Sequence, residues 1–595
     1  MSSALTLWDW GIIVFFLLLF VGIGVKAGKS SALNIQEYFL GGRRLPWWLA
    51  GGSMVATTFA ADTPLAVTEL VYKNGIAGNW LWWNAVAGGM LTVFFFAAYW
   101  HRSGVMTDAE LVELRYSGKA ARFLRGFRAV YLGLFMNVLI IAWVNLAMLS
   151  LLKVFFDLQD TEAFLWLAGM MVLVMFYASL SGLKGIAATD VVQFVVAMGG
   201  CIALALFVLH SESVGGMQAL KSRLAEDRLS FFPAIGKAAE NGHAMTIGIG
   251  SFLAFIGVQW WASWMPGAEP GGGGYIAQRL MSTRSETEAV KAGLFFQILH
   301  YALRPWPWIV VALCAVVLYP DLLARNEARY GFVYVMRDFL PEGLRGLLLV
   351  AFMAAYMSTI STQLNWGASY LTGDLYRRFL VPPAKFSGQA ALNRHYVVVS
   401  KLFTVLLAIA GLITTLYANS ITGIWEFIIE CGAGLGLVLI LRWYWWRVNA
   451  WSEITATIVP LIVYFIAKFV LVQWDPVWGL SLREAPHAYY LTVGMTTMAW
   501  IGVTLLTPPT DIAQLKAFYE KVQPLGWWKP ISGQDGRRPL LGLLIAWGLG
   551  VGLVYSLLFG IGYAVLLEFL PMAINFFIAV VCGGTLFFVM KRLQK

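Results

Sequence analysis

The fold is decided by the stretch WWLAGGSMVATTFAADTPLAVTELVY, residues 47–72. It is long and apolar enough to cross a bilayer, but its centre carries the polar residues Thr57, Thr58, Asp62 and Thr63. Pro64 removes a backbone donor as well. A bilayer tolerates a broken backbone only where protein or a water-filled cavity covers it, and a buried carboxylate there indicates a functional site. We therefore expect an unwound membrane helix of the kind that holds an ion and a solute in transporters.

The composition is that of a polytopic membrane protein. Of the 595 residues, 59% are hydrophobic and 12% are charged, whereas soluble domains carry about 25% charge. The Lys and Arg residues behind the net charge of +10 fall in short loops on alternate sides of the apolar runs, so we exclude a nucleic-acid partner. The four cysteines lie singly in separate apolar segments and the six histidines show no ligand spacing, so no metal cluster is expected.

About fifteen apolar segments of roughly 20 residues follow one another along the chain. The first has no basic leader and no small-residue cleavage site, so we interpret it as a membrane helix and not as a removed signal. Asp9 precedes it and Lys26 and Lys29 follow it, which predicts an N-terminus outside and, after fifteen crossings, a cytoplasmic C-terminus. The predicted location is the plasma (inner) membrane, with multiple crossings.

The hydropathy pattern fits two units of five spans with opposite orientation. The second unit opens with SFLAFIGVQWWASWMPGAEPGGGGY, which Pro266 and a glycine-rich run interrupt. This predicts an all-α inverted-repeat transporter with broken first and sixth core helices and a central site between the units. The expected divisions are an extra N-terminal transmembrane helix and inner loop (1–46), a first repeat (47–210), an outer loop (211–243), a second repeat (244–448) and additional C-terminal transmembrane helices (449–595).

A polar helix face appears in the span AAYMSTISTQLNWGASYLTGDLY, where Ala355, Ser358, Thr359 and Thr362 recur at helical spacing. Two hydroxyls one turn apart offer hard oxygen ligands for a hard cation. Equally, such hydroxyls can bond to their own i−4 carbonyls or hold two helices together. Asp190, in SGLKGIAATDVVQFVVAMGG, is by itself interpreted as a charge favoured at a helix N-terminus.

Taken together, the chain resembles the sodium:solute symporter family, which includes bacterial proline, galactose and sialic-acid symporters and the animal sodium–glucose cotransporters. Four motifs carry the resemblance: EYFLGGRRLPWWLAGGSMVATTFAAD, SGLKGIAATDVVQ, YIAQRLMSTRSETEA and MSTISTQLNWGASYLTGDLY. It extends over nearly all of the chain to about residue 450. The resemblance implies a five-plus-five inverted repeat, alternating access, and inward sodium flow that drives solute uptake.

The resemblance also implies a sodium site between the broken first helix and the eighth core helix. By position its contributors would be Ala56, Phe59, Ala355, Ser358 and Thr359, with Asp190 close to them. The chain departs from the family nearer the solute, because Thr58 replaces an Asn of sugar-transporting members, and Asp62 and Thr63 replace their Glu-Gln. The insert MPGAEPGGGG, with Glu269, is a further departure.

Candidate solute contacts lie on the first, sixth, seventh and tenth core helices: Asp62, Thr63, Gln259, Trp260, Trp261, Ser263, His300, Arg304, Glu426 and Glu430. Trp faces among hydrogen-bonding groups favour a sugar or polyol, although most of the 27 Trp residues must be packing or interface anchors. Arg304 either forms a buried pair with Asp62 or a glutamate, or faces the cavity, where it would favour a carboxylate substrate. Several acids without a free cation would favour an amine.

The sequence therefore predicts a sodium-coupled symporter that imports a small polar organic solute, with a sugar or polyol favoured. The alternatives are a sodium- or proton-coupled transporter of an amino acid, carboxylate or amine, and a solute-sensing transporter-like protein. We find no nucleophile or phosphate-cradling loop that would indicate an enzyme, because GAEPGGGG lacks the Lys and Ser/Thr of a P-loop. The expected partners are the solute, Na⁺ and the lipid bilayer, with no obligate protein partner.

Overall fold

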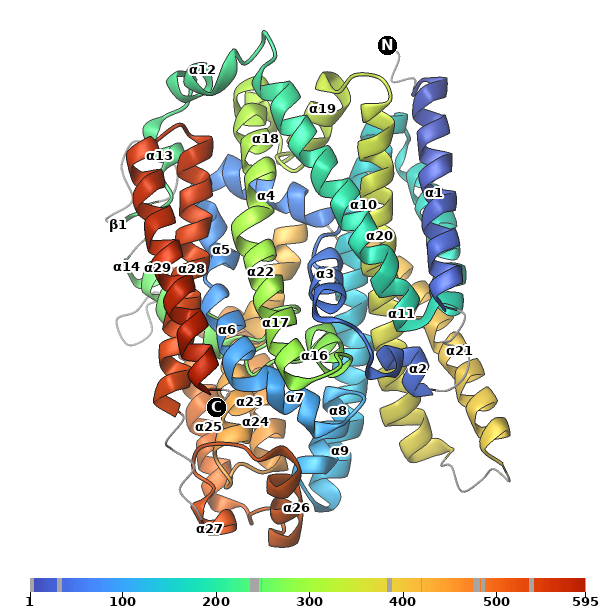
Figure 1. Cartoon of the computed structure of the whole chain (residues 1–595), viewed down its shortest axis with the longest axis vertical. Helices are drawn as coiled ribbons and strands as arrows, with labels where there is room; N and C mark the ends of the chain where they lie inside the picture. Colours follow the sequence, from blue (N-terminus) through green and yellow to red (C-terminus); the bar gives the residue numbers. More distant parts are fainter. Residues whose placement is uncertain are drawn as a thin grey trace.

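The computed structural model describes residues 5–28, 35–235, 246–247, 249–381, 388–418, 420–474, 482, 487–533 and 540–593. In these ranges the chain is nearly all helix, and most long helices run along the long axis of the molecule (Figure 1). A span in lipid must satisfy its own backbone polar groups, which an α-helix does. The described strands are two residues each, β1 (Ala234–Ile235) and β2 (Thr246–Ile247), paired in parallel. The predicted all-α class is confirmed.

The N-terminal helix packs outside the repeats. α1 (Leu7–Gly28) begins beside the start of α20 (Leu344–Ser369), because Asp9 Oδ1 accepts hydrogen bonds from the backbone nitrogens of Gly343 and Gly346 at 2.8 and 2.7 Å. A short helix and a tight turn then lead into the first repeat: α2 (Ile35–Leu40) and η1 (Gly41–Arg43).

The first core helix is broken, as predicted. α3 (Trp47–Thr57) and α4 (Asp62–Asn74) are separated by the unwound residues 58–61. The Thr58 hydroxyl donates back to the carbonyls three and four residues earlier, at 2.9 and 3.1 Å, and so satisfies two of the last carbonyls of α3. Pro64 lies in the first turn of α4, where a missing N–H removes no helical hydrogen bond.

The rest of the first repeat is built from straight and interrupted helices. The second core helix comprises η2 (Ile76–Asn79), α5 (Trp80–Trp83), α6 (Val86–Leu91), η3 (Thr92–Phe96) and α7 (Ala97–Ser103). The short helix α8 (Asp108–Arg115) precedes the third core helix, which comprises α9 (Gly118–Val130), η4 (Tyr131–Met136) and α10 (Asn137–Phe156). The fourth and fifth core helices are joined in α11 (Asp160–Leu209).

The 50 residues of α11 form two arms that run in opposite directions. If straight, they would extend for about 75 Å, more than twice the bilayer core. However, Trp166 stacks on Phe156 beside the start of α1, and Gly200 packs against Leu348 at the start of α20. Lys184, between them, lies against Gly41 of the η1 turn, beyond the C-terminal end of α1. The two arms are the fourth and fifth core helices.

The second repeat also opens with a broken helix. It follows the connecting helices α12 (Gly216–Arg223) and α13 (Glu226–Leu229). The sixth core helix comprises α14 (Ile249–Leu253), η5 (Ala254–Gln259), α15 (Trp260–Ala262) and, after a break, α16 (Gly274–Met281). The predicted second break is confirmed, and the glycine-rich run forms most of it.

The tenth core helix is bent, which the sequence analysis did not predict. It comprises α22 (Ile421–Cys431) and α23 (Leu435–Tyr444), which meet at 52°. The backbones of its bend and of the sixth-helix break bond to each other, because Gly434 N donates to the Ala262 carbonyl at 2.9 Å.

The core helices between the sixth and the tenth, with their connections, are α17 (Glu286–Gln297), η6 (Ile298–Leu303), α18 (Pro305–Leu318), η7 (Pro320–Leu322), α19 (Tyr330–Phe339), η8 (Tyr370–Leu380) after α20, and α21 (Gln389–Thr415).

Further helices follow the two repeats. They are α24 (Ala450–Phe465), η10 (Ile466–Val470), η11 (Leu471–Trp474), α25 (His487–Leu506), α26 (Ile512–Val522), α27 (Lys529–Ser532), α28 (Leu540–Val565) and α29 (Phe569–Leu593). By length and composition, 10 helices in the described residues can span a membrane, or 11 with the bent pair α22–α23. The broken helices α3–α4 and α14–α16 are outside that count because their pieces are short. The figure of about fifteen crossings stays a prediction.

Candidate functional site

A cavity of about 90 Å³ lies where the broken first and sixth core helices meet. Its wall comes from both helix breaks and from α10, η6, α20 and α22. The polar part of the wall comprises Thr57, Thr58, Asp62, Thr63, His300, Arg304, Thr359 and Gln363. The aromatic part comprises Trp82, Trp143, Tyr275, Tyr301 and Trp425. This composition, mostly apolar rings with a few polar groups, is typical of small-molecule sites.

Arg304 fixes the open end of α3. Its Nη1 donates to the Thr58 carbonyl at 2.7 Å and to the Thr58 hydroxyl at 3.0 Å, and its guanidinium lies 5.2 Å from the Trp308 ring centroid. Nη2 lies 3.2 Å from His300 Nε2; because a guanidinium can only donate, Nε2 accepts and Nδ1 of His300 donates to the Thr58 hydroxyl at 2.9 Å. The cation therefore faces the carbonyl end of α3, where the helix dipole is negative.

Asp62 lies on the other side of the helix break from the end of α3, at the start of α4. It is the first helical residue, 5% exposed, and its carboxyl group faces the Trp143 indole. No ion pair within 4.0 Å joins Asp62 to Arg304 among the described residues, so the predicted alternative of a direct Arg304–Asp62 or Arg304–Glu pair is not what the structure forms. Each end of the broken helix is instead matched by a side chain of opposite charge.

Four of the expected solute contacts line the cavity, namely Asp62, Thr63, His300 and Arg304. The other six do not line the cavity. On the sixth core helix, Gln259 Nε2 donates to the Leu81 carbonyl, Trp260 packs on Trp547, Trp261 Nε1 donates to the Gly257 carbonyl, and Ser263 bonds to Tyr489. On the tenth, Glu426 is exposed and Glu430 is absent from the wall. Trp425 occupies the wall in place of Glu426, because adjacent helical residues point about 100° apart.

The aromatic wall was missed by the sequence analysis. Trp82 stacks on Tyr301 with centroids 5.7 Å apart, and Trp143 meets Trp425 edge-on at 6.3 Å. Only Tyr275 had a local signal, because it follows the glycine-rich run directly. The other rings belong to apolar spans rich in aromatic residues, where the sequence gives no reason to select one ring over another.

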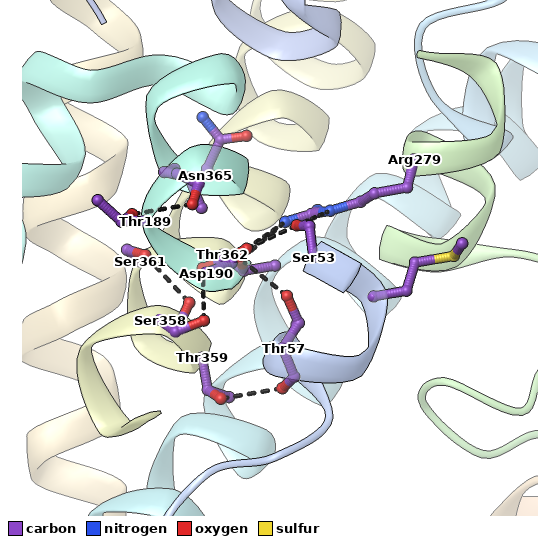
Figure 2. Close-up of polar contacts among 12 residues, drawn as sticks. Ser53, Thr57, Thr189, Asp190, Arg279, Ser358, Thr359, Ser361, Thr362 and Asn365 are labelled. Atoms are coloured by element: carbon purple, nitrogen blue, oxygen red, sulfur yellow. Dashed lines mark hydrogen bonds and ion pairs between the residues drawn. The ribbon is translucent and has the colours of Figure 1, made fainter. Parts of the chain in front are cut away.

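A second polar cluster joins α3, α11, α16 and α20 next to the cavity, with which it shares Thr57 and Thr359 (Figure 2). The Asp190 carboxylate accepts a hydrogen bond on each oxygen, from the hydroxyls of Ser358 and Ser53, both at 2.6 Å. Arg279 lies beside it, with Nη2 4.0 Å from Asp190 and 2.9 Å from the Thr362 hydroxyl that accepts its hydrogen bond. Asp190 is therefore a hydrogen-bonded buried carboxylate, and the predicted charge at a helix N-terminus is wrong, because Asp190 lies in the interior of α11.

Thr359 connects the eighth core helix to the broken first helix. Its hydroxyl donates to the Thr57 carbonyl at 2.9 Å. A hydroxyl that donates its hydrogen keeps two lone pairs, so Ser358 and Thr359 both retain oxygens that can bind a cation. Ala56 and Phe59, on the facing segment, are buried. This set of hydroxyl and carbonyl oxygens suits a hard alkali cation, and the described residues hold no cluster of three or more His, Cys, Asp or Glu that would suit a transition metal.

Two broken helices around a central cavity, with a hydroxyl-rich face against the first break, define a secondary transporter of the inverted-repeat type. The chain belongs to the sodium:solute symporter family, whose family model matches residues 38–459. It is thus a multi-pass membrane protein of a sodium-coupled family of transporters.

Relatives of known function are distant but cover most of the chain. The chain is 23% identical over 480 residues to a sodium/glucose cotransporter of Vibrio parahaemolyticus, covering 76% of this chain and 84% of that protein. It is 23% identical over 466 residues to the sodium/sialic acid symporter of Proteus mirabilis, covering 76% and 87%. A solved structure of a Na⁺-coupled sialic acid symporter superposes with a TM-score of 0.64 at 18% identity, over 85% of this chain and 99% of that chain.

Proposed function

We propose that this symporter imports a small neutral polar solute of the sugar or polyol class, driven by sodium entry. The observation that carries the proposal is the charge balance of the broken first helix. Arg304 is bonded to the carbonyl end of α3 at 2.7 Å, and Asp62 starts α4. A transporter can use an uncompensated helix N-terminus to hold a substrate carboxylate, but here a side chain already occupies that role.

The aromatic wall supports the same substrate class. Trp82, Trp143 and Trp425 offer ring faces for the apolar side of a sugar ring, while Thr63, His300 and Gln363 offer hydrogen-bond partners for hydroxyl groups. A carboxylate or an amine would bring a net charge into a cavity whose own charges are already matched, and an amino acid would bring two charged groups into it. The name of the sodium/glucose relative fits a neutral polyhydroxylated solute, whereas sialic acid is polyhydroxylated but carries a carboxylate.

We propose that sodium binds between the first break and the hydroxyl face of α20. Its contributors would be the carbonyls of Ala56, Phe59 and Ala355 and the hydroxyls of Ser358 and Thr359, with Asp190 adjacent. The support is geometric, because Thr359 already reaches the Thr57 carbonyl and Ser358 already reaches Asp190. Sodium there would hold α3 against α20 and so favour one arrangement of the two repeats by its differential affinity.

Transport then requires the helices around the cavity to separate. A volume of about 90 Å³ holds only about three waters, whereas ligand pockets reach about 300–1,000 Å³. Alternate opening at the two ends of the cavity would admit the solute on one side and release it on the other. We further propose an outer N-terminus and a cytoplasmic C-terminus in the plasma membrane.

The test is the thermal stability of the purified protein in sodium against choline chloride, followed by sodium with a panel of sugars, polyols, amino acids, carboxylates and amines. A ligand that binds only the folded state raises the melting temperature by mass action. We expect a sodium-specific rise and a further rise with a neutral polyhydroxylated solute. A further rise only with a charged solute would reject the substrate class, and the absence of any sodium shift would reject the sodium site.

A further inference from the structure

The break of the sixth core helix, residues 263–273, packs closely between α7 and α23. This close packing is possible because glycines at the contacts have no side chain. Gly271 and Gly272 have φ of +78° and +73°. A Cβ on them would lie 2.7 Å from the Leu439 carbonyl oxygen and 2.6 Å from Trp100 Nε1. Trp100 Nε1 also donates to the Gly271 carbonyl at 2.9 Å. These contacts hold the break, and with it Glu269, in the protein interior.

Glu269 and Asp108 line one small space of about 10 Å³, separate from the central cavity. They are 3% and 6% exposed. Glu269 Oε1 and Asp108 Oδ1 are buried without a hydrogen-bond partner among the described residues. A Cβ on Gly273 would lie 3.3 Å from Glu269 Cβ and 3.4 Å from Asp108 Oδ2, so the two side chains flank the same glycine.

The two carboxyl groups differ in the hydrogen bonds and cations close to them. Asp108 Oδ2 accepts a long hydrogen bond of 3.4 Å from Gly274 N at the start of α16. Arg128 and Arg442 line the same space, and both also approach Glu453, at 2.8 and 3.6 Å. Within the described part of the chain, no Lys, Arg or His nitrogen lies within 4.0 Å of the Glu269 carboxyl group.

The other titratable groups around Glu269 are its neighbours on six elements. They are Asp108 of α8, Arg128 of α9, Tyr131 of η4, Tyr275 of α16, Tyr301 of η6 and Arg442 of α23. The two arginines among them stabilise the ionised form of Asp108, and so does the N-terminus of α16. An ionised Asp108 in turn disfavours a second negative charge beside it.

We propose that Glu269 is a proton-binding site, which carries a proton while the break is buried and releases it when the helices around the break separate and admit water. Burying a carboxylate that no cation pairs with costs much more free energy than burying the neutral acid. A metal cation is a poor occupant, because two guanidinium groups line the same space. The space itself is no larger than one water requires.

The site couples a proton to the movement of the sixth core helix. The Glu269 side chain lies outside the cavity wall and outside the proposed sodium set, so proton release requires no direct contact with either. The break carries both Glu269 and the residues Met265 to Ala268 that line the cavity. A separation that hydrates Glu269 therefore also moves part of the cavity wall.

The experiment is infrared spectroscopy of the full-length protein in lipid across a range of buffer pH, at constant sodium. A protonated carboxyl group gives a C=O stretching band distinct from the carboxylate bands. We expect the wild-type spectrum to contain one protonated-carboxyl component that is lost in Glu269→Gln and that disappears as the pH is raised. Glu520→Gln, at an exposed position on α26, should leave every protonated-carboxyl component in place.

Asp108→Asn provides a second variant if Glu269→Gln fails to fold. Removing the neighbouring charge should move the loss of the Glu269 component to lower pH, whereas a purely structural role for Asp108 would leave it unmoved. An identical carboxyl band in wild type and Glu269→Gln would overturn the proposal. Sodium-dependent melting shifts of Glu269→Gln, measured in parallel, separate this result from failure of the sodium symport assignment.

Discussion

At the residue scale, the site depends on which oxygen each polar side chain reaches. Ser358 and Thr359 are neighbours on α20, yet one reaches Asp190 of α11 and the other reaches the Thr57 carbonyl of α3. Their roles therefore combine: each connects the eighth core helix to a different element. Asp62 lies at the start of α4 and lines the cavity together with Thr359, but it is not among the proposed sodium contributors.

Ser358→Ala combined with Thr359→Ala should raise the sodium concentration needed for transport at least about tenfold, because hydrogen bonds and ligands to a charged group are worth about 1.5–3 kcal/mol each. Sodium-dependent solute uptake in proteoliposomes measures this. Ser369→Ala is the matched control, since Ser369 is a buried hydroxyl on the same helix that donates only to its own Trp366 carbonyl. Uptake with an unchanged sodium requirement in the double variant would remove these residues from the sodium site.

Asp62→Asn should weaken solute affinity by about tenfold or more and change sodium affinity much less, because Asp62 lines the cavity and is not among the proposed sodium contributors. Solute- and sodium-dependent melting shifts of the same sample separate the two effects. The reverse pattern would move Asp62 from the solute site to the ion site.

At the element scale, the breaks and bends of the core helices are held by close backbone contacts. Gly436 on α23 shows how close, because a Cβ there would lie 2.1 Å from the Trp261 carbonyl oxygen and 2.7 Å from Pro270. The sixth and tenth core helices can therefore meet only where this position has no side chain.

Gly436→Ala should destabilise the protein by about 1–3 kcal/mol, the usual cost of forcing an extra methyl group into a packed interior. Thermal melting in detergent measures the change. Gly494→Ala is the matched control, because Gly494 lies within α25 and a Cβ there meets nothing within 4 Å. Equal melting temperatures for both variants would show that the α15–α23 contact is looser than described.

At the scale of the whole molecule, a buried ion network ties the first repeat to the C-terminal helices. Glu453 on α24 is fully buried, and its carboxylate lies 2.8 Å from Arg128 of α9, accepts the Tyr116 hydroxyl at 2.6 Å and lies 3.6 Å from Arg442 of α23. The helices beyond residue 449 are thus anchored in the core and do not merely flank it.

Glu453→Gln should cost about 3–5 kcal/mol of stability, because it leaves two buried guanidinium groups without their shared anion. Glu568→Gln, which removes the half-exposed Lys221–Glu568 pair at 3.0 Å, should cost at most about 1 kcal/mol. Chemical unfolding of both variants compares them. Similar losses would mean that the Glu453 network is as well hydrated as the surface pair.

The membrane class, the all-α fold, both helix breaks and the family were predictable from sequence patterns alone. These follow from local chemistry, because polar residues, Pro and Gly in an apolar span cannot remain a plain helix in lipid. The sequence also selected Asp62, Thr63, His300 and Arg304 for the cavity. Three features could be seen only in the folded chain. Arg304 bonds to the Thr58 carbonyl instead of a carboxylate. Trp425, and not Glu426, faces the cavity, and Glu269 lines the same small space as Asp108. Those features depend on the rotation of each helix about its axis and on packing between distant segments, neither of which hydrophobic periodicity predicts.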